Sequence, residues 1–155
     1  MTMCEVFLGL GSEQFGQALR AISPGKLKLH QMFDAVRIRL HLSKLNQESL
    51  KKAAPKVWAR IEANEEDLAR DISQAILVCH MDMIIAVLDL TGIPHEDGFF
   101  GKDADVKTFV LPKGWQDRAY SELSGKYPPS VLALYLNQLA HEVDENAPLF
   151  RPKVN

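Results

Sequence analysis

The alternation of apolar and polar residues is most regular between Asn64 and Thr91. One stripe at helical spacing comprises Leu68, Ile72, Ala75, Cys79, Met83, Ala86 and Leu90. From Ala75 onward the other faces are apolar too, which is typical of a helix that the rest of a fold surrounds. Asn64 and the three acids after it favour a helix start, and Gly92 and Pro94 favour a helix end. The pattern predicts one central helix over about 65–91.

Shorter helices are predicted on both sides of this central segment. Val36 to Leu42 alternates like a strand, but the helical spacing extends farther and no partner strand is evident, so we favour a helix. Pro55 lies inside another helical pattern, where we expect a kink or a restart. The flanking segments with helical spacing are 3–22, 26–45, 46–61, 115–123 and 129–145.

The fold class predicted from this pattern is all-α. We expect a bundle of five or six helices packed around the central helix, with one long loop over about 92–114. The length of 155 residues, with 46% hydrophobic and 25% charged residues, fits one globular domain over 1–155. An irregular tail is expected from about residue 146, because prolines follow the last periodic segment.

The central segment is almost long enough to cross a membrane, but three polar residues argue against that. His80, Asp82 and Asp89 interrupt the apolar run, and an Asp at mid-bilayer costs about 3 kcal/mol. No cationic region precedes the short apolar run at the N-terminus, so a secretory signal is not expected. Cys4 and Cys79 show no metal-binding spacing. We therefore expect a cytoplasmic protein without a membrane partner.

Charge is unevenly distributed although the net charge is only −2. Residues 26–60 hold nine basic and two acidic residues, a net +7, whereas residues 62–105 hold eleven acidic and two basic residues, a net −9. Such blocks can compensate each other on one surface or across a dimer contact, so we predict a homodimer. Only Phe33 and Trp58 supply aromatic rings to the basic block, which makes a nucleic-acid partner unfavourable.

Three carboxylates share one side of the predicted central helix. Asp71, Asp82 and Asp89 fall within about 20° of one another on a helical wheel. Asp82 and Asp89 lie in the part that we expect to be buried, where a carboxylate must be paired, bind a metal or take up a proton. Pairing to Arg37 or Arg39 is the simpler interpretation, and a pocket wall is the alternative.

The long loop opens with a cluster of groups that could carry chemistry. His95, Glu96 and Asp97 could supply metal ligands or an acid/base pair, and Phe99 and Phe100 could cover an apolar ligand. The simpler interpretation is a tight turn at Asp97-Gly98, with the phenylalanines tucked under the loop. His80 lies near Asp82 in sequence, but about 160° away from it on a helix.

Other histidines give weaker patterns. His30, Asp34 and His41 share a polar stripe that could bind a metal, although a solvated helix face explains the same spacing. His141 lies near the end of the last predicted helix, where the helix dipole favours a cation.

Two functions remain open from the sequence. The first is a non-catalytic binding or interaction protein that self-associates, with a protein or small-molecule partner. The second is a small metal-dependent hydrolase, with ligands drawn from His80, His95, Glu96, Asp97, His30 or His141. No cofactor is predicted for the first function, and a divalent metal would serve the second.

Overall fold

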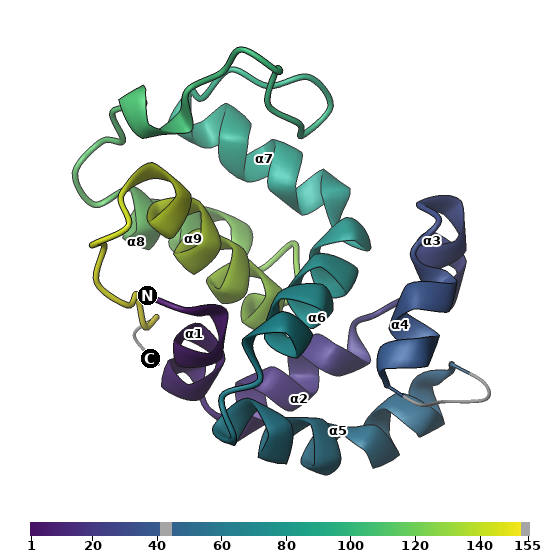
Figure 1. Cartoon of the computed structure of the whole chain (residues 1–155). Helices are drawn as coiled ribbons and strands as arrows, with labels where there is room; N and C mark the ends of the chain where they lie inside the picture. The colour runs from purple at the N-terminus through teal and green to yellow at the C-terminus, as the bar shows by residue number, and fades with distance from the viewer. Residues whose placement is uncertain (41–44, 153–155) are drawn as a thin grey trace. The chain divides into compact units, whose positions relative to one another are not determined.

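All regular structure in the described part of the chain is helical. The structure is a computed structural model and describes residues 1–40 and 45–152. These residues form nine α-helices and one short 3-10 helix, with no strand (Figure 1). One isolated β-bridge joins Glu96 and Phe99. The all-α prediction is confirmed, and the described helices are more numerous than the five or six expected.

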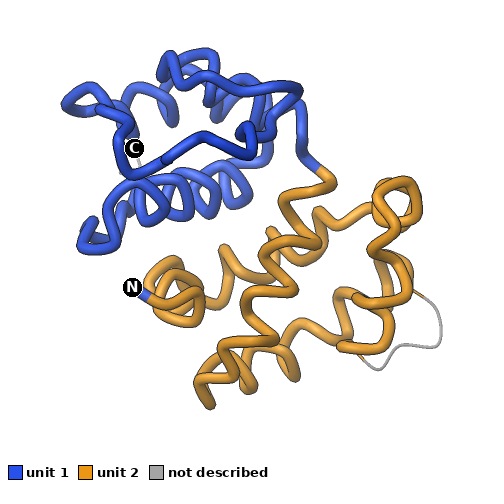
Figure 2. The backbone as a smooth tube through the Cα atoms, turned by 45° about the horizontal axis from the view of Figure 1, so that its top comes forward, with its two compact units in different colours: residues 1, 80–155 blue, residues 2–79 orange. Residues whose placement is uncertain are grey.

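The chain divides into two compact units (Figure 2). Unit 2 comprises Thr2–Cys79, and unit 1 comprises Met1 with His80–Asn155. The interpretation of the chain as one domain stays a prediction.

Unit 2 is organised around its last helix, α6. This helix contacts each of the five other helices of the unit. Seven of its thirteen residues are buried, including Leu68, Ile72 and Ile76. The part of the predicted apolar stripe that lies on α6 therefore faces the core of this unit. The helices are α1 (Met3–Leu10), α2 (Ser12–Arg20), α3 (Pro24–Leu29), α4 (Phe33–Arg39), α5 (Gln47–Glu62) and α6 (Glu66–Val78).

Unit 1 contains the most completely buried helix of the described chain, α9. Every residue from Ser130 to Asn137 on this helix is buried. Helix α8 packs against α7 and α9, and the 3-10 helix η1 packs against α9. The elements are α7 (Met81–Thr91), η1 (Val106–Thr108), α8 (Trp115–Leu123) and α9 (Pro129–Val143).

The predicted continuous helix over 65–91 is wrong at one point, because it breaks between Val78 and Met81. The Cys79 thiol accepts a hydrogen bond from Ser23 N–H at 3.3 Å and lies 3.2 Å from Ala75 O, to which it donates. These contacts tie the end of α6 to the segment before α3. Because neither glycine nor proline occurs at the break, the apolar periodicity continues through it, and sequence alone could not locate it.

Two further predictions of helix ends need correction. Asn64 does not cap α6: its φ is +65°, and Glu65 is the N-cap without a side-chain cap bond. The restart considered at Pro55 is absent, because α5 is helical from Gln47 to Glu62, and the kink considered there stays a prediction. Helix α4 confirms the helical interpretation of Val36 to Arg39, whereas residues 41 and 42 lie outside the described residues.

No single helix within residues 1–40 and 45–152 is long and apolar enough to cross a membrane. Helices α6 and α7 reach the required length and hydropathy only when taken together.

Candidate functional site

The predicted site at the start of the long loop is a tight turn packed on α7. Glu96 N–H donates to Phe99 O at 2.8 Å, and Phe99 N–H donates to Glu96 O at 2.9 Å. Asp97 and Gly98 between them have φ values of +52° and +90°. Positive φ at both central residues defines a type I′ turn, which Asp-Gly favours. The turn predicted at Asp97-Gly98 is confirmed.

His95 fixes this turn to α7 with both of its ring nitrogens. Gly98 N–H donates to Nδ1 at 3.0 Å, and Nε2 lies 2.6 Å from Asp89 Oδ1. An accepting Nδ1 places the proton of a neutral ring on Nε2, which then donates to Asp89. A metal ligand needs an unoccupied nitrogen lone pair. His95 could bind a metal only by giving up one of these hydrogen bonds.

The remaining loop candidates do not converge around a ligand. Glu96 and Asp97 are exposed, and the Phe99 side chain is 59% exposed. Phe100 packs edge-on against Phe109, with ring centroids 5.9 Å apart. Phe100 is half-buried against another loop residue and Phe99 is exposed, so the prediction that both pack under the loop is wrong for Phe99. Within the described residues, no group of three or more His, Cys, Asp or Glu side chains is placed to hold a metal ion.

The three carboxylates that were predicted on one side of the central helix lie on two helices, α6 and α7. Asp82 and Asp89 are exposed, so the prediction that they are buried is wrong. Both lie on α7, whose buried side is made by Met83, Ile84, Val87 and Leu88. Asp71 on α6 pairs with Arg39 on α4 at 2.7 Å, whereas the sequence favoured such a pair for the two carboxylates that were expected to be buried.

The other described histidines lie at or near the ends of helices. His30 ends α3, His80 precedes α7 and is half-buried, and His141 lies in the last turn of α9. His41 lies outside the described residues, so the stripe of His30, Asp34 and His41 stays a prediction. The His141 Nδ1 atom is enclosed and makes no hydrogen bond with a described residue.

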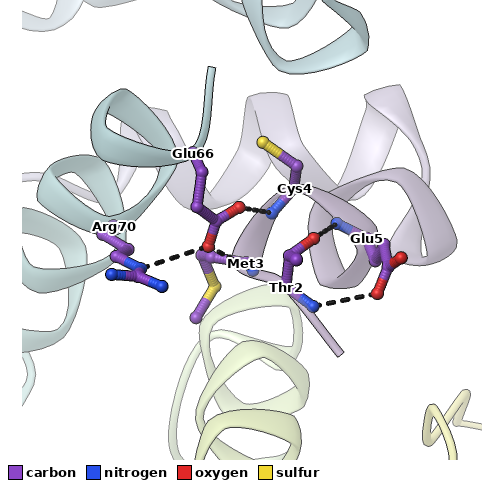
Figure 3. A network of polar contacts seen from close by, with 6 residues as sticks. All are labelled: Thr2, Met3, Cys4, Glu5, Glu66 and Arg70. Atoms are coloured by element: carbon purple, nitrogen blue, oxygen red, sulfur yellow. Dashed lines mark hydrogen bonds and ion pairs between the residues drawn. The ribbon is translucent and has the colours of Figure 1, made fainter. Parts of the chain in front are cut away.

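A half-buried carboxylate, that of Glu66, joins the first helix to α6 in unit 2 (Figure 3). Glu66 accepts hydrogen bonds from Met3 N–H at 2.7 Å and Cys4 N–H at 3.0 Å, and from Arg70 Nε at 3.3 Å. The first N–H groups of a helix have no partner within the helix. Burial would raise the pKa of Glu66, but the bonds from Cys4 and Met3 outweigh it and hold the pKa below its ordinary value.

Both cysteines are unreactive in this setting. Burial, and then the neighbouring Glu66, raise the pKa of Cys4 to about 11. Burial also raises the pKa of Cys79. A nucleophilic cysteine needs the opposite shift, toward the thiolate. Neither thiol has the environment of a catalytic nucleophile.

One cavity in unit 2 lies on one side of α5, and we name it the α5 cavity. Its volume is about 360 Å³. Six of its seven lining residues come from α5 and occupy about 140° of the helix circumference. The seventh, Leu40, follows α4. The lining residues are Leu40, Ser49, Lys52, Ala53, Lys56, Val57 and Arg60.

The α5 cavity combines an apolar floor with basic side chains. Leu40, Ala53 and Val57 are only 8%, 7% and 4% exposed. Lys52 and Lys56 are exposed and form no ion pair with a carboxylate of the described residues. Helical spacing over 46–61 alone puts both lysines on the polar face of α5, away from its apolar residues. This spacing does not reveal the cavity, because Leu40 is twelve residues before Lys52 and only the fold brings them together.

Arg60 is held in place at one end of the α5 cavity. Its Nε and Nη2 atoms donate to the two carboxylate oxygens of Glu65 at 2.8 and 3.0 Å. Its Nη1 atom donates to Arg39 O at 3.3 Å. The hydrogen bond from Arg60 lowers the pKa of Glu65. The charge of Arg60 is thus compensated by Glu65, whereas Lys52 and Lys56 form no ion pair with a carboxylate of residues 1–40 and 45–152.

A second groove of about 500 Å³ lies between α2 and α5. Glu13 stands there with Arg20 and Lys51, so charges of both signs line it. This mixture favours neither an anion nor a cation.

Comparison of the chain with protein-family models, with curated proteins and with solved structures gives no match.

Proposed function

We propose that the protein is a non-catalytic helical binding module and that the α5 cavity is its binding site. The observation that carries the proposal is an apolar floor beside two lysines that pair with no described carboxylate. Sites for small molecules have volumes of about 300–1,000 Å³ and combine apolar walls with a few placed polar groups. The α5 cavity falls within this range.

The spacing of the two lysines supports an anionic ligand. Lys52 and Lys56 are one helical turn apart, and like charges at this spacing destabilise a helix by a few tenths of a kcal/mol. An anion bound between them would replace this repulsion with attraction. The two lysines therefore slightly destabilise the free protein but favour the binding of an anion.

Titration with anilinonaphthalene sulfonate tests the proposal. This dye carries one anionic group on an apolar ring system, and its fluorescence rises in an apolar environment. We expect saturable binding to the whole chain. The double variant K52Q/K56Q should bind the dye at least about tenfold more weakly, because it keeps the floor and removes both charges.

The matched control is K107Q/K126Q, which also removes two exposed lysines but none that lines the α5 cavity. It should bind the dye as the unmodified chain does. Equal binding by the unmodified chain and K52Q/K56Q would contradict the proposal.

Self-association as a homodimer is part of the same proposal. Exposed acids on unit 1, such as Asp82 and Glu96, and exposed bases on unit 2, such as Arg37 and Lys51, support pairing between two copies. Light scattering should give twice the 17.4 kDa of one chain at low salt. A mass of one chain at high protein concentration and low salt would remove this part.

The metal-dependent hydrolase stays a prediction that no observed contact favours. His95 uses both ring nitrogens to hold the turn, and Glu96 and Asp97 are exposed. Elemental analysis of protein purified without a chelator tests it. Near-stoichiometric zinc or manganese would favour the hydrolase over the binding module.

We also propose a cytoplasmic location. The support is that Cys4 and Cys79 are buried free thiols. Free thiols persist in reducing compartments. Measuring the fraction of each thiol that is oxidised in protein from cell extracts tests this proposal.

A further inference from the structure

The α5 cavity separates an apolar part from a charged part, and this division defines a class of ligand. Leu40, Ala53 and Val57 provide the apolar floor. Lys52 and Lys56 provide ammonium groups on the same face of α5, within about 40° of each other around the helix axis. A ligand that matches both parts has an anionic head group and an apolar body.

The head group must be small and singly or doubly charged. The Arg60 guanidinium already binds Glu65 and Arg39 O, so it is not available without breaking these bonds. The Ser49 hydroxyl is bonded to Asn46 in the cap of α5. Among the described lining residues, Lys52 and Lys56 remain to compensate the charge of the ligand. A carboxylate or a phosphate monoester matches their combined charge.

The lining also argues against two larger classes of partner. None of the seven residues is aromatic, so a nucleotide base would find no ring on which to stack. A stable protein interface uses roughly 20–30 residues on each side. Seven lining residues around about 360 Å³ suit one small molecule instead.

We propose that the α5 cavity binds a single-chain anionic amphiphile, an alkyl carboxylate or alkyl phosphate, with its head group between Lys52 and Lys56 and its chain over Leu40, Ala53 and Val57. This inference rests on the proposed function of the cavity as a binding site. It adds the chemical class of the ligand.

Displacement of bound anilinonaphthalene sulfonate from the whole chain tests the inference. The competitors are decanoate, decyl phosphate, decanol and decyltrimethylammonium, each below its micellar concentration. Decanoate and decyl phosphate should displace the dye. Decanol should require a concentration roughly tenfold higher, because it lacks the charge, and decyltrimethylammonium should not compete. Comparing the two anions distinguishes carboxylate from phosphate recognition.

Two variants test the head-group site and the site of the alkyl chain independently. Calorimetry measures the direct binding of decanoate and of decanol to each variant. K52Q/K56Q should lose roughly tenfold in affinity for decanoate and keep its affinity for decanol. Ala53→Met narrows the floor and should weaken both ligands by a similar factor. K107Q/K126Q should bind decanoate unchanged. Circular dichroism establishes that each variant is helical, and the exposed lysine variants keep the test valid if Ala53→Met does not fold.

Failure of this inference differs from failure of the proposed function. If dye binding depends on Lys52 and Lys56 but neither alkyl anion displaces the dye, the amphiphile is the wrong ligand. The proposal that the α5 cavity is a binding site then stands. Dye binding that does not depend on these lysines overturns both. Sedimentation with vesicles containing phosphatidylglycerol should show no association. If the unmodified chain associates with the vesicles and K52Q/K56Q does not, the two lysines bind lipid head groups at a membrane surface. The proposal of a single-chain ligand would then be wrong.

Discussion

The Asn137 side chain pairs with the backbone of Phe150. Asn137 Nδ2 donates to Phe150 O at 2.9 Å, and Phe150 N–H donates to Asn137 Oδ1 at 2.8 Å. Asn137 is 3% exposed, on the most buried stretch of α9. The Phe150 ring also lies 6.3 Å from the Tyr120 ring. The irregular segment after α9 is thus attached to this helix at a defined point.

Asn137→Ala should destabilise the protein because it removes both bonds and leaves two backbone groups of Phe150 unpaired. Each partly buried group without a partner costs about 1–3 kcal/mol. Urea denaturation followed by circular dichroism measures the loss. Asn146→Ala is the matched control, since Asn146 is exposed. Within the described residues its backbone N–H donates to Asp144, and its side chain forms no hydrogen bond. Equal stability of the two variants would show that the Phe150 contact does not contribute.

Glu66→Gln should reduce stability most at neutral pH. The folded protein lowers the pKa of Glu66 below its unfolded value, so the charged carboxylate stabilises the fold above the unfolded pKa. This contribution decreases as the pH falls through the folded pKa. An amide still offers one oxygen to Met3 and Cys4 but loses the charge. We expect a loss of roughly 1–3 kcal/mol at pH 7.

Unfolding free energies of the Glu66→Gln variant and the unmodified chain should therefore converge toward pH 3. Glu62→Gln, at an exposed position on α5, serves as the control. A difference between the unmodified chain and Glu66→Gln that stayed constant from pH 7 to pH 3 would contradict the electrostatic explanation.

Gly98→Ala should destabilise the turn on α7 for two reasons. Gly98 has a φ of +90°, and a Cβ there would lie 2.8 Å from Met81 Cε. Positive φ alone costs an alanine roughly 1–2 kcal/mol. Gly101→Ala is the control, because no atom lies within 4 Å of its Cβ position. Thermal unfolding should show a lower midpoint for Gly98→Ala only.

Local sequence signals predicted the elements whose geometry depends on neighbouring residues. The Asp97-Gly98 turn needs only two residues that tolerate positive φ, and the sequence contains them in that order. The apolar stripe through Leu68 and Ile72 likewise predicted the buried face of α6. These features follow from backbone sterics and helical periodicity, which act over a few residues.

Features that join distant segments were not predicted from the sequence. Glu66 was expected to favour the start of its own helix, but its carboxylate accepts from α1, more than sixty residues earlier. Cys79, at the break between α6 and α7, likewise accepts a hydrogen bond from Ser23, 56 residues earlier. The α5 cavity needs Leu40 beside Val57. Periodicity specifies which side of a helix is apolar, but not which residue it meets.

The Cys4 thiol should be almost inert toward alkylation in the folded protein. Burial and Glu66 raise its pKa to about 11, whereas a free thiol has a pKa of about 8.5. At pH 8 the thiolate fraction is then at least about 100-fold smaller than that of a free cysteine. Iodoacetamide labelling, with mass spectrometry of the peptide containing Cys4, measures the rate.

Unfolding supplies the control for this experiment. In concentrated urea the burial and the Glu66 contact are both lost, so Cys4 should react at the rate of a free cysteine. Because the thiolate is the reacting species, the folded-state rate should rise about tenfold for each pH unit between pH 8 and pH 10. Rapid labelling at pH 8 under native conditions would show that the first turn of α1, which contains Cys4, opens readily. The contact between Glu66 and Cys4 would then contribute little to the stability of unit 2.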